Sequence, residues 1–280
     1  MTVSAAPAAF LADLRASVAE WCATVSSLSP ASCSHGPVDA VSCAWYHGVW
    51  PFLREVDMVS SPTWHHDFYR TWLPRDAGGP VLVSGAADFS MVAYAIEAGA
   101  EPVVLDQCRT PLDASEWYAR RAGARLTTRQ ADLLRDDLGV ADAAVIVSDA
   151  LLTRFAPADA AIVAKKWFGA LAPGGRVVTT VRIHSGSAFD ADGEARGRAQ
   201  FAERLRRKLD AHHHKIGTAD LVVAAGVYAD KMTSANLGSA GSIRRVFEAA
   251  GFTIVHEELA VVRGEFAPTR YLRLVAERPA

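Results

Sequence analysis

Residues 81–90 read VLVSGAADFS, and this stretch decides the fold. The apolar run Val81–Val83 predicts a buried strand, and the small residues after it predict a tight turn at Gly85. The next residues predict a helix. A second apolar run over 102–105 then ends in Asp106, which follows Gly85 by 21 residues. The pattern predicts a βαβ unit with a carboxylate at the sequence distance at which a nucleotide ribose is bound.

The chain after residue 78 alternates between apolar runs and helical patterns. Further strands are expected near 124–127, 141–147 and 176–181, with helical segments between them. The last two strands, at 252–257 and 271–276, have only a short loop between them, so we expect an antiparallel pair. The sequence therefore predicts an α/β fold with a doubly wound, mostly parallel, seven-stranded sheet.

The N-terminal quarter of the chain has a different character. Its apolar residues recur at helical spacing, and five of the seven tryptophans lie before residue 73. We expect residues 1–77 to form a helical N-terminal cap, or substrate lid, ahead of a core over residues 78–280. Within that core, residues 184–238 are expected to form a helical insertion near the site.

Composition and charge exclude several classes of protein. The chain has 280 residues, of which 50% are hydrophobic and 21% charged, with a net charge of −2. A nucleic-acid-binding protein would need a basic surface, so no nucleic-acid partner is expected. No uncharged apolar run approaches the length of a membrane span, and the N-terminus does not resemble a signal peptide. We expect a cytoplasmic protein without membrane contact, either a monomer or a homodimer.

The cysteines predict neither disulfides nor a metal site. Cys22, Cys33, Cys43 and Cys108 show no CxxC spacing. They fit neither a disulfide framework nor a zinc knuckle, so no metal is expected and the thiols are expected to be reduced.

Two further motifs carry a resemblance to a known family. Residues 171–177 read LAPGGRV and residues 246–252 read VFEAAGF. Together with the glycine turn and the acid after the second strand, they resemble the class I S-adenosylmethionine-dependent methyltransferases over roughly residues 78–280. The turn departs from the family pattern of several glycines, because Ala86 and Ala87 follow Gly85. The resemblance implies a Rossmann-like methyltransferase fold with S-adenosyl-L-methionine as cofactor.

The resemblance also implies where this cofactor binds. Gly85 would admit it to the first turn, Asp106 would accept hydrogen bonds from its ribose hydroxyls, and Asp132 would contact its adenine. Ser148 and Asp149 end a strand at the edge where open sheets bind ligands, although an Asp there often only caps the next helix. The full set of expected cofactor-binding residues is Gly85, Ala86, Ala87, Asp88, Asp106, Gln107, Asp132, Leu133, Ser148 and Asp149.

A general base is harder to identify from the sequence. Histidine titrates near neutral pH, so a histidine in the aromatic cap is a candidate, although packing or surface exposure is a slightly better explanation of these residues. The candidates are His47, His65, His66, Tyr69 and His184.

The predicted function is methyl transfer from S-adenosylmethionine to an oxygen or nitrogen of a small molecule, in the biosynthesis of a specialised metabolite. The partner is therefore a small-molecule methyl acceptor. One alternative is an NAD(P)-dependent oxidoreductase, which shares the βαβ unit, although GxGxxG is absent. The other is a non-catalytic binding module of methyltransferase fold, which the altered glycine turn keeps open.

Overall fold

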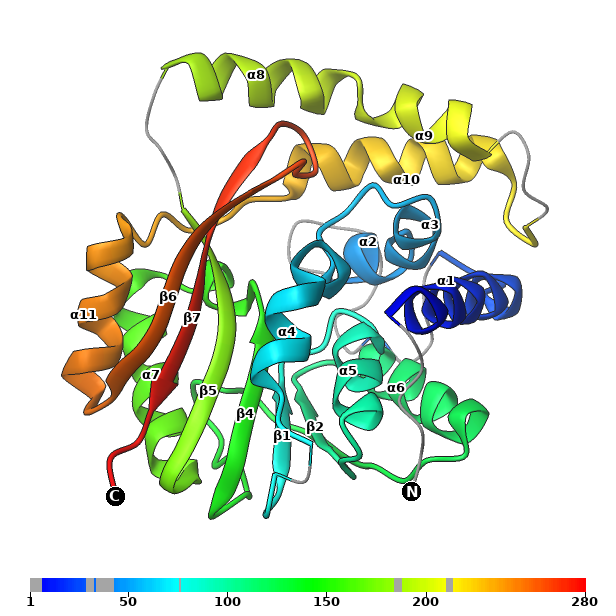
Figure 1. The fold of residues 1–280 in the computed structure, drawn as a ribbon. Coiled ribbons are helices and arrows are strands. Elements are labelled where there is room, and N and C mark those ends of the chain that lie inside the picture. Colours follow the sequence, from blue (N-terminus) through cyan, green and yellow to red (C-terminus); the bar gives the residue numbers. More distant parts are fainter. Residues whose placement is uncertain (1–6, 29–32, 34–42, 76, 184–187, 210–213) are drawn as a thin grey trace.

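A seven-stranded sheet with the order β3-β2-β1-β4-β5-β7-β6 forms the centre of the molecule. The computed structural model describes residues 7–28, 33, 43–75, 77–183, 188–209 and 214–280 (Figure 1). The first five strands are parallel, and β7 lies antiparallel between β5 and β6. This confirms the predicted fold class. The strands are β1 Val81–Ser84, β2 Val103–Asp106, β3 Thr127–Gln130, β4 Ala143–Asp149, β5 Leu171–Ile183, β6 Thr253–Val262 and β7 Thr269–Glu277.

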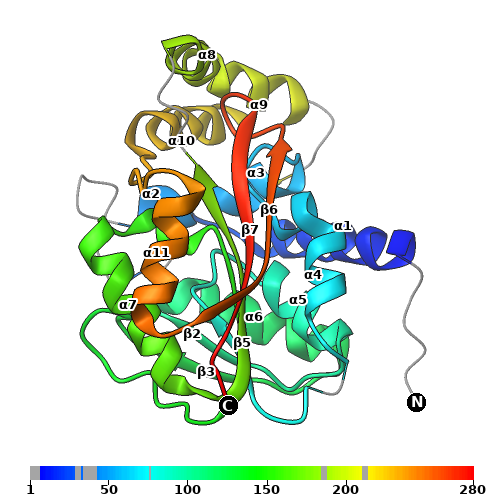
Figure 2. The ribbon, with the colours of Figure 1, turned by 60° about the vertical axis from the view of Figure 1, so that its left-hand side comes forward.

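Helices cover both faces of the sheet because the central strands are apolar on both sides. Val81 and Val83 of β1 pack into one hydrophobic cluster, whereas Leu82 packs into the other, as the two-residue period of a strand requires. The first cluster includes helices α5 Ser90–Glu97 and α6 Arg109–Ala122, and the second includes α7 Pro157–Ala170 and α11 Ala240–Ala250 (Figures 1 and 2).

The N-terminal segment folds as short helices against the first cluster. They are α1 Pro7–Thr24, α2 Ala44–His47, α3 Trp50–Glu55, the 3₁₀ helix η1 Pro62–His65 and α4 His66–Trp72. The helical pattern of residues 38–56 predicts a helix that Pro51 interrupts. In the structure, Pro51 lies in the first turn of α3, where its missing N–H costs nothing, and this helix begins at Trp50. The part of that expected helix over 38–42 lies outside the described residues.

A second helical layer follows β5 in the chain. It consists of α8 Ala188–Ala199, α9 Phe201–Leu209 and α10 Thr218–Lys231. Phe201 stacks on Tyr228 at a ring distance of 5.6 Å, and Phe266 of the β6–β7 turn meets Phe201 at 5.1 Å. Figure 1 shows α8, α9 and α10 stacked beyond α2 and α3, with the end of the β6–β7 hairpin beside them. These three helices lie within 184–238, and the division of the chain into a cap, a core and an insertion stays a prediction.

One detail of the sequence prediction was wrong. The third strand is Thr127–Gln130 instead of 124–127, because it is an edge strand with mostly exposed side chains and so lacks an apolar run. None of the described helices combines the length and the apolar character needed to cross a membrane.

Candidate functional site

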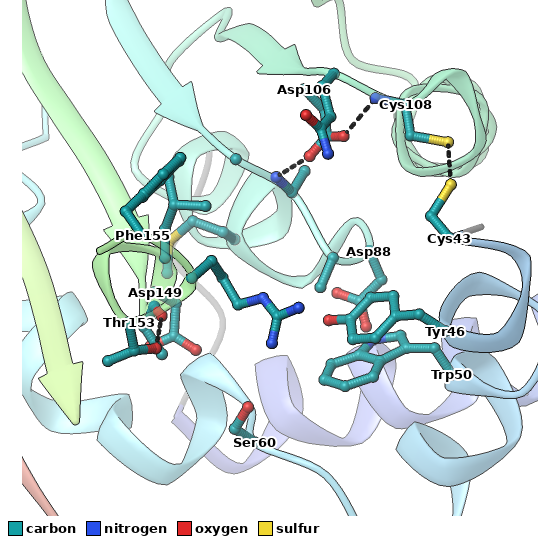
Figure 3. A pocket seen from close by; sticks show the side chains of 18 of the residues that line it. Cys43, Tyr46, Trp50, Ser60, Asp88, Asp106, Cys108, Asp149, Thr153 and Phe155 are labelled. Carbon is teal, nitrogen blue, oxygen red and sulfur yellow. Dashed lines mark hydrogen bonds between the residues drawn. The ribbon is translucent and has the colours of Figure 1, made fainter. Parts of the chain in front are cut away.

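A cavity of about 610 Å³ opens where β1, β2 and β4 end. Such a volume is typical of small-molecule sites, and the carboxyl edge of a doubly wound sheet is where such sites form. Tyr46 and Trp50 of the N-terminal helices line it, and so do Glu265 and Tyr271 from the β6–β7 hairpin. Figure 3 shows the rings of Tyr46 and Trp50 beside Asp88.

Gly85 makes the sharp turn from β1 into the cavity wall. Its φ is +73°, a left-handed conformation that glycine adopts at little cost, and its N–H donates to the carbonyl of Leu105 at 2.8 Å. A Cβ at this position would lie 2.6 Å from Cδ1 of Leu151. The turn therefore needs glycine for both its backbone conformation and its packing.

Asp106 ends β2 with its carboxylate fixed by two backbone donors. Its Oδ2 accepts the N–H of Ala86 at 2.9 Å, and its Oδ1 accepts the N–H of Cys108 at 2.7 Å (Figure 3). Burial raises the pKa of this carboxyl to about 6, against the opposing effect of these two hydrogen bonds. Each oxygen retains a further lone pair, and the residue lines the cavity.

Asp88 links the glycine turn to the N-terminal helices. Its Oδ2 lies 2.6 Å from Nε of Arg54 on α3, and the two side chains are 13% and 5% exposed. Its Oδ1 accepts the N–H of Ser90 at 2.7 Å. Burial alone would raise the pKa of this carboxyl, but the Arg54 guanidinium and the Ser90 hydrogen bonds outweigh burial and lower it. Arg54 therefore secures the helical segment to the cavity wall.

Asp149 lies on the cavity wall at the end of β4, and two hydroxyl groups fix its carboxylate. Its Oδ1 accepts the hydroxyl of Tyr69 at 2.7 Å and that of Thr180 at 2.8 Å. Ser148 is fully buried and does not line the cavity. Of this adjacent pair, only Asp149 is placed to meet a ligand.

Most of the predicted cofactor residues meet at this one cavity. Asp132 lines it, although its Oδ1 accepts the N–H of Leu134 at 2.8 Å and so also closes its own turn. All the residues expected to bind the cofactor except Ser148 line the cavity: Gly85, Ala86, Ala87, Asp88, Asp106, Gln107, Asp132, Leu133 and Asp149. Their proximity is a structural result, whereas their role as cofactor ligands stays a prediction.

Most of the residues predicted as candidate bases do not line the cavity. His65 is 2% exposed and His66 bonds to the Tyr94 hydroxyl at 2.8 Å, and neither lines the cavity. Burial lowers the pKa of both histidines. Tyr69 is fully buried, and burial holds the pKa of its hydroxyl well above the ordinary value. Of the candidates in the described chain only His47 lines the cavity, and His184 lies outside the described residues.

Several wall residues were not predicted. Tyr46 and Trp50 stack with ring centroids 4.6 Å apart, and burial raises the pKa of the Tyr46 hydroxyl. Glu265 is 7% exposed, and its Oε1 accepts the N–H of Ser60 at 3.1 Å. The concentration of aromatic residues before residue 73 was the available signal for the two rings. No local pattern marks Glu265, because it reaches the cavity through the β6–β7 turn.

His47 lies among the thiols of three cysteines at the edge of the cavity. Its Nδ1 lies 3.4 Å from Sγ of Cys108 and 3.7 Å from Sγ of Cys33. Burial would raise the pKa of the Cys108 thiol, but the hydrogen bond and charge of His47 outweigh it and lower the pKa to about 5. The sequence analysis considered only the spacing of the cysteines, and the structure brings three of them together around His47.

Comparisons with known proteins show which solved structures have a similar fold. No family model and no curated protein sequence matches this chain. Among solved structures, an S-adenosylmethionine-dependent methyltransferase from Mesorhizobium loti is 21% identical, with a TM-score of 0.52 over 77% of this chain and 98% of that chain. Another from Methanosarcina mazei is 14% identical, with a TM-score of 0.53 over 79% of this chain and 99% of that chain.

A third similar structure contains a bound nucleoside. It is the N-methyltransferase NodS from Bradyrhizobium japonicum in complex with S-adenosyl-L-homocysteine, 12% identical, with a TM-score of 0.51 over 84% of this chain and 99% of that chain. At such identities the likeness is one of fold. The chain has the Rossmann-like fold of the class I S-adenosylmethionine-dependent methyltransferases.

Proposed function

We propose that this protein transfers a methyl group from S-adenosylmethionine to an oxygen or nitrogen atom of a small molecule. The observation that carries the proposal is the cavity at the ends of β1, β2 and β4, with the Gly85 turn and the Asp106 carboxylate in its wall. The similarity of the fold to S-adenosylmethionine-dependent methyltransferases supports it.

The residues present fit this cofactor. Asp106 is held by Ala86 and Cys108 with one lone pair of each oxygen still available, which suits two vicinal ribose hydroxyls. The cavity of about 610 Å³ lies within the range of small-molecule sites, and we propose that the acceptor enters it beside the cofactor. The bound cofactor would supply an activated methyl group for displacement by the acceptor.

The chain contributes positioning and exclusion of water. Holding a nucleophile and a methyl group at near-attack distance removes most of the entropic cost of such a displacement. We propose that the cap over residues 1–77 and the insertion over 184–238 close over the cavity and select the acceptor. The stacked rings of Tyr46 and Trp50 suit an acceptor with a planar or apolar face.

Glu265 is the wall group best suited to take a proton from the acceptor. It is a carboxylate on the cavity wall, nearly buried and oriented by the Ser60 N–H. None of the histidines predicted from the sequence combines these properties in the described chain, since His47 faces three thiols. Glu265→Gln should therefore reduce kcat for a hydroxyl acceptor while leaving cofactor affinity unchanged.

Isothermal titration with S-adenosylmethionine, S-adenosylhomocysteine and NADH tests the cofactor assignment. We expect the first two to bind and NADH not to bind. Asp106→Ala should weaken the binding by about 1–3 kcal/mol, and the control Asp113→Ala, on the exposed side of α6, should leave it unchanged. Binding of NADH alone would favour the oxidoreductase, and binding without turnover of any acceptor would favour the non-catalytic module.

A further inference from the structure

Three cysteines and one histidine converge at the edge of the cavity, and we propose that they form a zinc site. The residues are Cys33, Cys43, His47 and Cys108, and one ligand atom of each lies within 4.8 Å of all the others. Figure 3 shows Cys43 and Cys108 facing each other across this point. This proposal does not depend on methyl transfer, because it concerns only these four side chains.

Four of the six separations between the ligand atoms match those around a tetrahedral ion. Zinc binds thiolate sulfur at about 2.3 Å and imidazole nitrogen at about 2.0–2.1 Å, so tetrahedral ligands lie about 3.8 Å apart for two sulfurs and about 3.5 Å apart for sulfur and nitrogen. The Sγ of Cys108 is 3.7 Å from that of Cys43 and 3.9 Å from that of Cys33. Nδ1 of His47 is 3.4 Å from Sγ of Cys108 and 3.7 Å from Sγ of Cys33. These four separations lie close to those expected, and the two that remain, from Cys43 to Cys33 and to His47, are at most 4.8 Å.

The fold supplies the ligands from three separate parts of the chain. Cys43 precedes the first residue of α2 and His47 is its last, so the two side chains lie one helical turn apart. Cys108 precedes α6 directly, at the carboxyl end of β2. Cys33 comes from the segment before α2. A CxxC pattern is absent because no two cysteines share a turn.

The chemistry of the ligand set favours zinc in a structural role. Three thiolates with one imidazole form a Cys₃His set, which is typical of closed, four-coordinate zinc sites. With four protein ligands the ion has no open position for substrate. The sulfurs are too far apart for a disulfide, in which they would be about 2.05 Å apart.

The ion would hold one wall of the cavity in place. Through Cys43 and His47 it would attach α2, which carries Tyr46, to the turn after β2. The same turn positions the Asp106 carboxylate, whose Oδ1 accepts the Cys108 N–H. Zinc at this point therefore stabilises the arrangement of the cavity before any ligand enters.

Metal analysis of the purified full-length protein tests the proposal directly. After exhaustive dialysis against chelator-treated buffer, elemental analysis should find about one zinc per chain. Cys33→Ser should lose the metal and lower the melting temperature, since a ligand bound only by the folded state stabilises it. The matched control is Cys22→Ser, a buried cysteine of α1 outside the cluster, which should retain full zinc content.

A second measurement uses cobalt as a spectroscopic probe of the same four ligands. Protein stripped of metal should bind one equivalent of Co²⁺ with intense tetrahedral d–d bands and a thiolate charge-transfer band, both absent in Cys33→Ser. Substoichiometric zinc together with a weak, octahedral Co²⁺ spectrum would overturn the proposal. A disulfide between cluster cysteines in freshly purified protein, or iron or copper as the bound metal, would also overturn it. Failure to bind S-adenosylmethionine would leave it intact and count only against the proposed function.

Discussion

Burial raises the pKa of Asp106, whereas its proposed role in binding needs the ionised carboxylate. Its carboxyl has a pKa raised to about 6, so near neutral pH it is ionised and can accept hydrogen bonds from two hydroxyls. Below pH 6 it takes up a proton, and a protonated carboxyl has lost acceptor capacity. A ligand that binds through this carboxylate should therefore bind less tightly in acid.

The affinity for S-adenosylhomocysteine is expected to decline as the pH falls through about 6. Because the ligand needs the ionised form, each pH unit below this pKa should weaken binding by up to about tenfold, or about 1.4 kcal/mol. Titration calorimetry between about pH 5 and 8, from about one unit below the midpoint to about two units above it, measures this. In Asp106→Asn the binding should be weak at every pH, whereas Asp113→Asn should follow the wild-type curve.

The buried ion pair between Arg54 and Asp88 is expected to contribute to the stability of the folded protein. Removing one partner of such a buried pair leaves an uncompensated charge, so Arg54→Met should reduce the free energy of unfolding by about 3–5 kcal/mol. Arg54→Met with Asp88→Asn should cost less than Arg54→Met alone. Urea denaturation of the four forms gives the coupling energy, and simple additivity would contradict the assigned pairing.

The sign of the pH effect for Asp88 follows from its lowered pKa. A carboxyl with a lower pKa in the folded state than in the unfolded state contributes stability at neutral pH, and this contribution is lost as the pH falls through the folded pKa. Wild-type protein should therefore lose more stability in acid than the double variant does.

At the scale of elements, the Gly85 turn connects β1 to the wall of the cavity. Gly85→Ala would place a side chain at a positive φ and against Leu151, so we expect a loss of about 1–3 kcal/mol in the free energy of unfolding. In Gly85→Ala combined with Leu151→Ala, the loss of stability caused by the steric clash should disappear, whereas the loss caused by the positive φ should remain. The control Gly169→Ala lies in α7 with nothing near the added carbon and should not destabilise.

Helix α10 supports the aromatic wall from behind. Tyr228 is fully buried, and its ring lies 6.0 Å from those of both Tyr46 and Trp50. Tyr228→Ala should lower the free energy of unfolding by about 3–5 kcal/mol and weaken ligand binding at the cavity. On the same helix, Val223 is 68% exposed, and Val223→Ala should change neither quantity in thermal melts or titrations.

At the scale of the whole molecule, the sheet was predictable and the cluster of ligands was not. Apolar runs marked the buried central strands, and the absence of a helix before residue 271 indicated the antiparallel pair. The edge strand β3 lacked that signal because its side chains are exposed. The predicted cofactor residues came together because turns at the carboxyl edge of one sheet are adjacent in space.

The missed features depend on contacts distant in sequence. Cys108 meets Cys33 only after β2 and the N-terminal segment have packed, and Glu265 reaches the cavity only through the hairpin that completes the sheet. Local periodicity carries no information on such pairings, so a search for CxxC or for a histidine base could not find them.

The place of β7 in the sheet has a consequence for biosynthesis. This strand is the last in the sequence, yet it is hydrogen-bonded on both sides, to β5 and to β6. While the ribosome is still adding residues 269–277, the edge of β5 that will pair with β7 exposes unpaired backbone N–H and C=O groups, with which strands of other chains can pair. The sheet can be completed only after synthesis of these residues. Until then the newly made protein is prone to aggregation, which molecular chaperones would have to prevent.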